Sequence, residues 1–363
     1  MTSSQLKPSF MEQAVPVHLP QWRRRIYTII GLLIASAIVA AFATTIGSVQ
    51  IPFLTTVKIL ISQLPLVDIV PTWQSVTETI ILEIRLPRVI MAGLVGAALS
   101  IAGATYQGLF RNPLADPYLI GVAQGASLGA VIGFLLPFEW QGAGFGVIPI
   151  LAFTGAICSV ATVYFLARVG KALPVTTLIL AGVALGALWG SVISYLILNS
   201  GEKIHGIIFW MMGSFSLSEW SEVAAASPYI LAGIIIILLH GRSLNVMQLD
   251  EEQAQQLGIN VERVKLILLA AATLITAAAV SFVGTIGFVG IIIPHAVRLI
   301  WGPDNRFLLP LSILTGAIFL MLADLGARTV MAPIEIPIGV ITAICGVPFF
   351  LYLLRRRKRA VFF

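Results

Sequence analysis

Ten runs of apolar residues, most of them about twenty residues long, recur along the chain. A helix needs about twenty apolar residues to cross the hydrocarbon core of a bilayer. Because backbone groups in lipid must be satisfied within the segment, runs of this length predict helices, and the fold class is an all-α polytopic membrane protein of about ten transmembrane helices. The predicted spans are residues 26–46, 89–109, 119–136, 147–166, 177–198, 223–239, 264–283, 287–301, 308–327 and 337–354.

Composition leads to the same class of protein. Apolar residues make up 58% of the chain and charged residues only 10%, whereas a soluble domain carries about 25% charged residues. The net charge of +6 does not indicate nucleic-acid binding, because the basic residues lie mostly in short loops between apolar runs. Cys158 and Cys345 lie inside apolar runs and are predicted to be small core residues.

Basic residues also predict the orientation. An even number of spans places both termini on one side, and the clusters at residues 23–25 and 355–359 predict that this side is cytoplasmic. Of the 22 basic residues, 17 then lie inside. The five left outside are Lys58, Arg85, Arg88, Lys203 and Arg328. The expected location is the cell inner membrane.

The organisation is predicted to be one membrane domain, residues 23–359, with two short tails. Residues 1–22 are polar and precede an apolar run too long for a signal peptide, so we expect a disordered cytoplasmic tail and no cleavage. Residues 360–363 would end the chain in the cytoplasm. Residues 50–87 are expected to lie along the outer surface. Residues 206–220 are expected to form a short interfacial or re-entrant piece, because tryptophan favours the headgroup level.

The 32 glycines, many of them inside the spans, have two readings. Small residues let membrane helices approach closely, which favours tight packing. Alternatively, some of the glycines line a wide path or serve as hinges.

The longest polar stretch after the N-terminus is residues 242–265. Within it, Asp250 to Leu257 is predicted to be helical and to end at Gly258 in a left-handed cap. Asn260 could cap a second short helix, which would give a pair of short cytoplasmic helices. Three acidic residues favour the start of the first helix: Asp250, Glu251 and Glu252. The stretch is either a solvated connector or a docking element that a partner pushes on.

The polar stretch also carries a resemblance to known transporters. Its E-x-A-x-x-L-G pattern, at Glu252, Ala254, Leu257 and Gly258, resembles the coupling-loop signature of ABC importer membrane subunits. Residues 85–130, RLPRVIMAGLVGAALSIAGATYQGLFRNPLADPYLIGVAQGASLGA, resemble the FecCD family of iron–siderophore, haem and cobalamin permeases. Further motifs follow in family order at residues 178–187, 210–215, 284–298 and 322–350.

The resemblance implies a mechanism. Two permease copies, identical or closely related, form a dimer with a central pathway. Two cytoplasmic ATPase subunits dock on the coupling loops, and a substrate-binding protein docks outside. The chain has no G-x-x-x-x-G-K-[ST] sequence, so we expect it to be no enzyme and to hold no cofactor, with ATP and Mg bound by the partner ATPase.

The predicted function is ATP-driven (type II ABC) import of an iron(III)–siderophore, with cobalamin or haem as alternatives. A secondary transporter driven by an ion gradient is the alternative class. It would need buried ionisable relays, and charged residues within the spans are few, chiefly Asp324.

Three outer arginines are predicted to dock the binding protein. In the family, arginines at the positions of Arg85, Arg88 and Arg328 meet acidic residues, and the guanidinium fork can bind a carboxylate bidentately. The alternatives are snorkelling anchors or, for Arg328, a pair with Asp324 four residues earlier.

Two stretches are predicted to close the path on the cytoplasmic side. One is Gln124 in the third span, and the other is the start of the fifth span at Val175, Thr176 and Thr177. The alternative is ordinary capping by threonine and packing by small residues.

A proline-rich cytoplasmic turn matches a family motif at Asn112, Pro113, Asp116 and Pro117. It is expected to fix the turn and to brace the ATPase. His295 has no second histidine or carboxylate at ligand spacing, so we expect a structural role for it and no metal site.

Overall fold

A computed structural model describes residues 21–47, 49–63, 67, 70–137, 141–142, 145–170, 172–249 and 251–361. Residues 1–20 of the predicted N-terminal tail and the last two residues of the predicted C-terminal tail lie outside the described part. Residues 21–22 and 360–361, which were assigned to these tails, are helical.

All ten predicted spans are helical, which confirms the all-α fold. The helices are α1 (Gln21–Thr45), α4 (Leu86–Leu109), α5 (Val122–Leu135), α6 (Val147–Ala167), α7 (Val175–Leu198), α9 (Trp220–Leu239), α12 (Val261–Val283), α13 (Val289–Trp301), α14 (Asn305–Thr329) and α15 (Ile338–Val361). In the described part of the chain, seven helices are long and apolar enough to cross a membrane, whereas α5, α13 and the apolar part of α15 are shorter.

The connections contain short elements. They are α2 (Phe53–Ser62), α3 (Ser75–Thr79), the π-helix η1 (Ile80–Arg85), the 3₁₀ helix η2 (Pro117–Ile120), the two-residue strands β1 (Gln141–Gly142) and β2 (Phe145–Gly146), the 3₁₀ helix η3 (Gly201–Lys203), α8 (Ile204–Met211), α10 (Gly241–Val246) and α11 (Glu251–Gln256). The short helix α8 lies where an interfacial piece was expected.

The prediction that residues 50–87 run along the outer surface is wrong for its second half. From Ser75 the chain is helical without a break through α3 and η1 into α4. Pro87 lies at the start of α4, directly after the π-helical turn η1.

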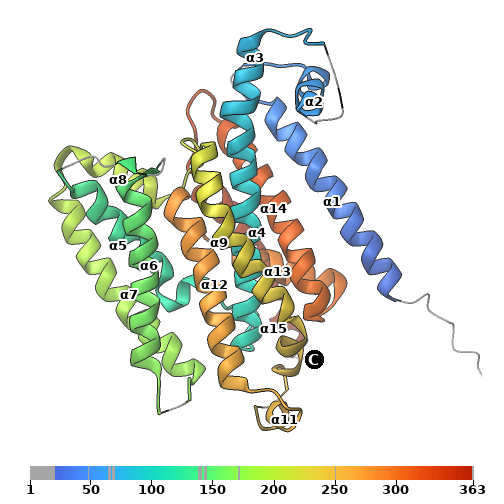
Figure 1. Cartoon of the computed structure of the whole chain (residues 1–363). Coiled ribbons are helices and arrows are strands. Elements are labelled where there is room, and N and C mark those ends of the chain that lie inside the picture. Colours follow the sequence, from blue (N-terminus) through green and yellow to red (C-terminus); the bar gives the residue numbers. More distant parts are fainter. Residues whose placement is uncertain are drawn as a thin grey trace, which may run out of the picture.

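Helix α4 is the central element of the bundle, and α1 stands at its edge (Figure 1). Of the apolar window within residues 75–109, 89% is buried, compared with 6% for α1. Helix α4 packs against α12, α13 and α14, while α5, α6 and α7 pack on one another.

The two ends of the bundle differ in what they carry. The start of α1, the end of α15 and α11 lie toward one end, and α2 and α3 lie at the other (Figure 1). Both ends of the described chain therefore share the end that carries α11, as an even number of spans requires. That this end faces the cytoplasm stays a prediction.

Glycines bring the central helices into backbone contact. A Cβ placed on Gly103 of α4 would lie 1.9 Å from the carbonyl oxygen of Gly290 in α13. A Cβ on Gly96 would lie 2.2 Å from the carbonyl oxygen of Gly316 in α14. At these positions the glycines serve close packing, the first of the two readings.

The prediction that both cysteines are core residues is wrong. Cys158 and Cys345 are exposed on the surfaces of α6 and α15. A bundle in lipid turns apolar faces outward, so an apolar neighbourhood in the sequence does not imply burial.

We predict that Gly103→Ala destabilises the protein, because the added methyl group cannot fit against Gly290 without moving α13. Overpacking of this kind costs about 1–3 kcal/mol. Thermal unfolding in detergent should show a lower midpoint. The control is Gly31→Ala in α1, where nothing lies within 4 Å of the new methyl group. Equal midpoints for the two variants would contradict the packing assignment.

Candidate functional site

Arg88 joins three segments of the chain at the end of the bundle that carries α3. Its Nη2 lies 2.8 Å from Asp324 Oδ1 in α14, and its Nη1 lies 2.8 Å from Glu335 Oε1 in the loop before α15. Ser216, in the loop before α9, donates a hydrogen bond to Glu335. Burial alone would raise the pKa of Glu335, but the hydrogen bonds from Arg88 and Ser216 outweigh it and lower that pKa below its usual value.

The other two arginines hold the end of α1. The last carbonyls of a helix have no partner within it, and cations are favoured there by the helix dipole. Arg328 also lies next to Asp324, with 3.5 Å between Nε and Oδ2. Arg85 donates hydrogen bonds to Thr45 O (2.5 Å) and to Val49 O (2.5 Å). Arg328 donates hydrogen bonds to Ala43 O (2.6 Å) and to Ile46 O (3.0 Å).

The docking prediction for these arginines is not tested by this geometry, but the geometry constrains it. The exposed fraction is 5% for the residue Arg85, and 11% and 6% for the side chains of Arg88 and Arg328. The pair of Arg328 with Asp324, which the spacing of four suggested, is present. Sequence reasoning missed Glu335 and the carbonyls of α1. A docking partner would have to replace internal bonds, and Glu335 is the more exposed of the two carboxylates that hold Arg88.

At the other end of the bundle, α10 and α11 form an elbow between α9 and α12. Gly258 follows α11 with φ +83°, as the predicted left-handed cap requires, and Ile259 N donates to Ala254 O at 3.2 Å. The prediction that Asn260 starts a second short helix is wrong. Its side chain accepts from Arg263 N at 3.1 Å and caps the long helix α12, so the short pair is α10 and α11.

The elbow turns one apolar residue inward and others outward. Ala254 is buried, whereas Glu252 is exposed and Leu257 is 63% exposed. Leu249, before α11, is also exposed. The two leucines flank the polar helix α11. Asp250 and the side chain of Glu251 lie outside the described part.

The four predicted gate residues do not form one cluster. Gln124 in α5 lies against Gly186, since its Cδ would be 3.6 Å from a Cβ added there. Val175 begins α7, eleven residues or about three turns earlier than Gly186. Thr177 Oγ1 donates to Pro174 O at 2.9 Å and to Ala167 O at 3.0 Å, which is an ordinary helix-start role. The gating prediction stays untested.

The predicted cytoplasmic turn is held by its own side chains. Asn112 Oδ1 accepts from Leu114 N at 3.0 Å, and Asp116 Oδ1 accepts from Tyr118 N at 2.8 Å. Pro117 begins η2. Burial raises the pKa of Asp116 to about 6, and the bond from Tyr118 N opposes this shift. These contacts fix the turn, while its bracing of an ATPase stays a prediction.

The described residues include no group of three or more histidines, cysteines or carboxylates that could hold a metal ion. The His295 ring packs edge-on against Phe349, with 6.4 Å between ring centroids.

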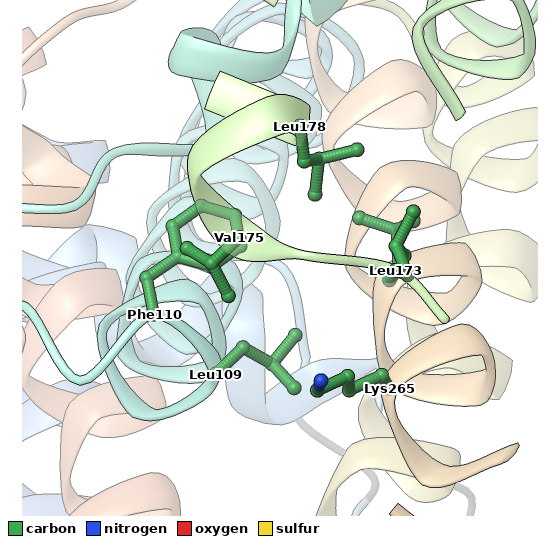
Figure 2. A pocket seen from close by; sticks show the side chains of 7 residues that line it. Leu109, Phe110, Leu173, Val175, Leu178 and Lys265 are labelled. Atoms are coloured by element: carbon green, nitrogen blue, oxygen red, sulfur yellow. The ribbon is translucent and has the colours of Figure 1, made fainter. Parts of the chain in front are cut away.

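A cavity separates the end of α4 from the start of α7 on the α11 side. Figure 2 shows Leu109 and Phe110 at the end of α4 with Val175 beside Phe110, Leu173 across from them next to α12, and Lys265 reaching toward Leu109 from α12. The adjoining open space is about 360 Å³ and is also lined by Arg111, Thr176 and Glu262. The start of α7 therefore has free volume next to it.

Comparisons with known proteins cover most of the chain. The model of the FecCD transport family matches residues 32–356. The uncharacterized ABC transporter permease protein YvrB of Bacillus subtilis is 48% identical over 281 residues, which are 77% of this chain and 80% of YvrB. The cobalamin import system permease protein BtuC of Halobacterium salinarum is 49% identical over 281 residues, 77% of this chain and 74% of BtuC. A solved structure described as "an inward-facing conformation of a putative metal-chelate type ABC transporter" matches with a TM-score of 0.79 at 30% identity. It covers 91% of this chain and 99% of its own.

We predict that Arg328→Met destabilises the protein, because it leaves the Ala43 and Ile46 carbonyls without their donor and removes one of the two ion-pair partners of Asp324. Removing one partner of a buried ion pair costs about 3–5 kcal/mol. The measurement is the thermal midpoint in detergent, with the exposed Arg242→Met as control. A midpoint equal to that of the control would show that α1 is not held in this way.

Proposed function

The chain belongs to the FecCD transport family and is the permease subunit of an ABC importer, and on that premise we propose that it imports an iron(III)–siderophore complex across the cell membrane. In this proposal two ATPase subunits bind at α11, a second copy of the chain completes the pathway, and a substrate-binding protein docks at the opposite end.

The surface of the α10–α11 elbow is the observation that supports the ATPase assignment. Leu249 and Leu257 expose apolar side chains on either side of the polar helix α11. The turn after α11 is closed by backbone bonds, so force on α11 reaches the start of α12. An ATPase that covers these leucines would bury them and push on a stiff element.

Helix α7 supports the proposed pairing of two copies. Most of its apolar surface is exposed although it starts beside the cavity. The exposed residues are Leu180, Val183, Leu188, Tyr195 and Leu198. Two copies that face each other through α7 would enclose a pathway between them.

The binding protein would dock at the end that carries α2, α3 and the arginine cluster. There Glu335 is the partner of Arg88 that a carboxylate from outside can replace. The ion-gradient alternative is weaker here, because Asp324 within α14 is held by Arg88 and Arg328, and a held carboxylate is a poor proton relay.

Cobalamin is the second candidate substrate. The 49% identity to a cobalamin permease favours it, whereas the structural match to the metal-chelate transporter type fits either chelate. Haem is the third.

The deciding experiment for the substrate is uptake into proteoliposomes that contain the chain, its ATPase subunits and its binding protein. We expect ATP-dependent uptake of a radiolabelled iron(III)–siderophore, while cobalamin and haem at the same concentration are not accumulated. Accumulation of cobalamin alone would replace the first candidate with the second. Uptake of any substrate without the ATPase subunits would contradict the ABC assignment.

We predict that Leu257→Glu weakens binding of the ATPase subunits by about tenfold or more, because it places a charge in an apolar contact worth about 1.5–3 kcal/mol. The measurement is the amount of ATPase that copurifies with a tagged permease. The control is Leu217→Glu, in the loop before α9 at the opposite end, where the leucine is also exposed. Equal copurification from both variants would remove α11 from the interface.

A further inference from the structure

We propose that Glu262 is a positioning residue that links the α11 elbow to the segment leading into α7, so that movement of the elbow moves Val175 and Thr176. This inference rests on the proposed function, because it assumes that an ATPase moves α11 and that the start of α7 takes part in closing the pathway.

One carboxylate makes both contacts. Glu262 lies in the first turn of α12, and its Oε2 accepts a hydrogen bond from Leu173 N at 2.9 Å. Its Oε1 accepts from Lys265 Nζ at 3.0 Å. The ion pair within α12 fixes the carboxylate, and the backbone N–H of a residue 89 positions away completes it.

The segment that Glu262 holds is short and internally bonded. Val169 and Ala172 exchange two backbone hydrogen bonds of 3.0 and 3.1 Å, which closes a tight turn after α6. Leu173 is the next residue, it is buried, and Pro174 then caps α7. Because only Pro174 separates Leu173 from Val175, a displacement of the Leu173 amide is passed to the first turn of α7.

The path from α11 to Glu262 is equally stiff. Between α11 and α12, Leu257 N bonds Gln253 O, Gly258 N bonds Gln255 O and Ile259 N bonds Ala254 O, at 2.9–3.2 Å. Asn260 then caps α12. Residues 257–259 are therefore bonded to α11 and Asn260 to α12, so a single peptide unit joins the two bonded segments and α11 and the start of α12 should move together.

The surroundings leave room for that movement. The open space of about 360 Å³ beside the cavity is lined by Leu173, Val175 and Thr176 and by Leu109 and Arg111 at the end of α4. Figure 2 shows the apolar side chains of Leu109, Phe110 and Val175 gathered there. The segment is thus tied to α12 by a directional hydrogen bond and faces free space near α4.

Three substitutions separate the reach of this side chain from its charge. Glu262→Gln keeps an oxygen that can accept from Leu173 N but loses the charge. Glu262→Asp keeps a charge at the helix start, which the dipole favours, but is one methylene too short to reach Leu173. Glu262→Ala loses both.

The experiment uses the full complex in nanodiscs, in a Cys158→Ala, Cys345→Ala background. Thr176→Cys supplies a thiol whose labelling rate with a maleimide is compared with ATP-analogue and with ADP. With Glu262 intact we expect the two rates to differ, and with Glu262→Gln most of the difference should remain. With Glu262→Asp and with Glu262→Ala the difference between the two labelling rates should vanish. In these two variants ATP-driven transport should also fall about tenfold, while ATP hydrolysis continues. Glu202→Ala, an exposed glutamate in η3 at the opposite end, is the control and should match the parent.

Two results would overturn the link: a nucleotide-dependent labelling difference that survives in Glu262→Asp and Glu262→Ala, or a Glu262→Gln variant that loses it while Glu262→Asp keeps it. These results leave the proposed function standing. If the parent complex shows no ATP-dependent transport, the proposed function fails and the inference fails with it. If Glu262→Ala does not assemble, Glu262→Asp and Glu262→Gln still show whether the length or the charge of the side chain at position 262 is required for the labelling difference.

Discussion

Backbone contact between α4 and its neighbours is the interaction on which the rest of this structure depends. In lipid, apolar side chains gain little by leaving the hydrocarbon, so helices associate through close packing and polar contacts. Gly96 and Gly103 bring α4 against the backbones of α14 and α13. This fixes one end of α4 near Asp324 and Glu335, and the other end at the wall of the cavity beside α7.

Helix α1 illustrates how polar contacts complete a membrane bundle. Little of its surface is buried, yet both of its ends are tied down. Arg85 and Arg328 bond the carbonyls at its end, and at its start Arg25 lies 3.3 Å from Asp304. Hydrogen bonds from Arg306, together with those from Asn245, lower the pKa of Asp304 below its usual value, so it stays charged and able to hold Arg25. The charged residues near the ends of the helices thus position a helix that packing alone would not.

The sequence predicted the ten helices because the length of an apolar run is a local property. It also predicted the pair of Asp324 with Arg328, which are four residues apart on one helix. It could not predict that Arg88 meets Glu335, 247 residues away, or that Glu262 meets the Leu173 amide. Such contacts depend on how helices are placed, and one sequence carries no spacing that records this. The prediction that both cysteines lie in the core was wrong for the same reason, because an apolar run does not show which face of its helix meets lipid.

The structure leads us to expect that ATPase subunits bind this permease at the α10–α11 elbow. The most direct measurement is photo-crosslinking in intact cells from a benzophenone amino acid placed at Gln255 in α11, compared with one at Gln63 after α2 at the opposite end; both positions are exposed. We expect an adduct with the ATPase subunit from position 255 and none from position 63. An ATPase adduct from position 63, or none from position 255, would contradict the account.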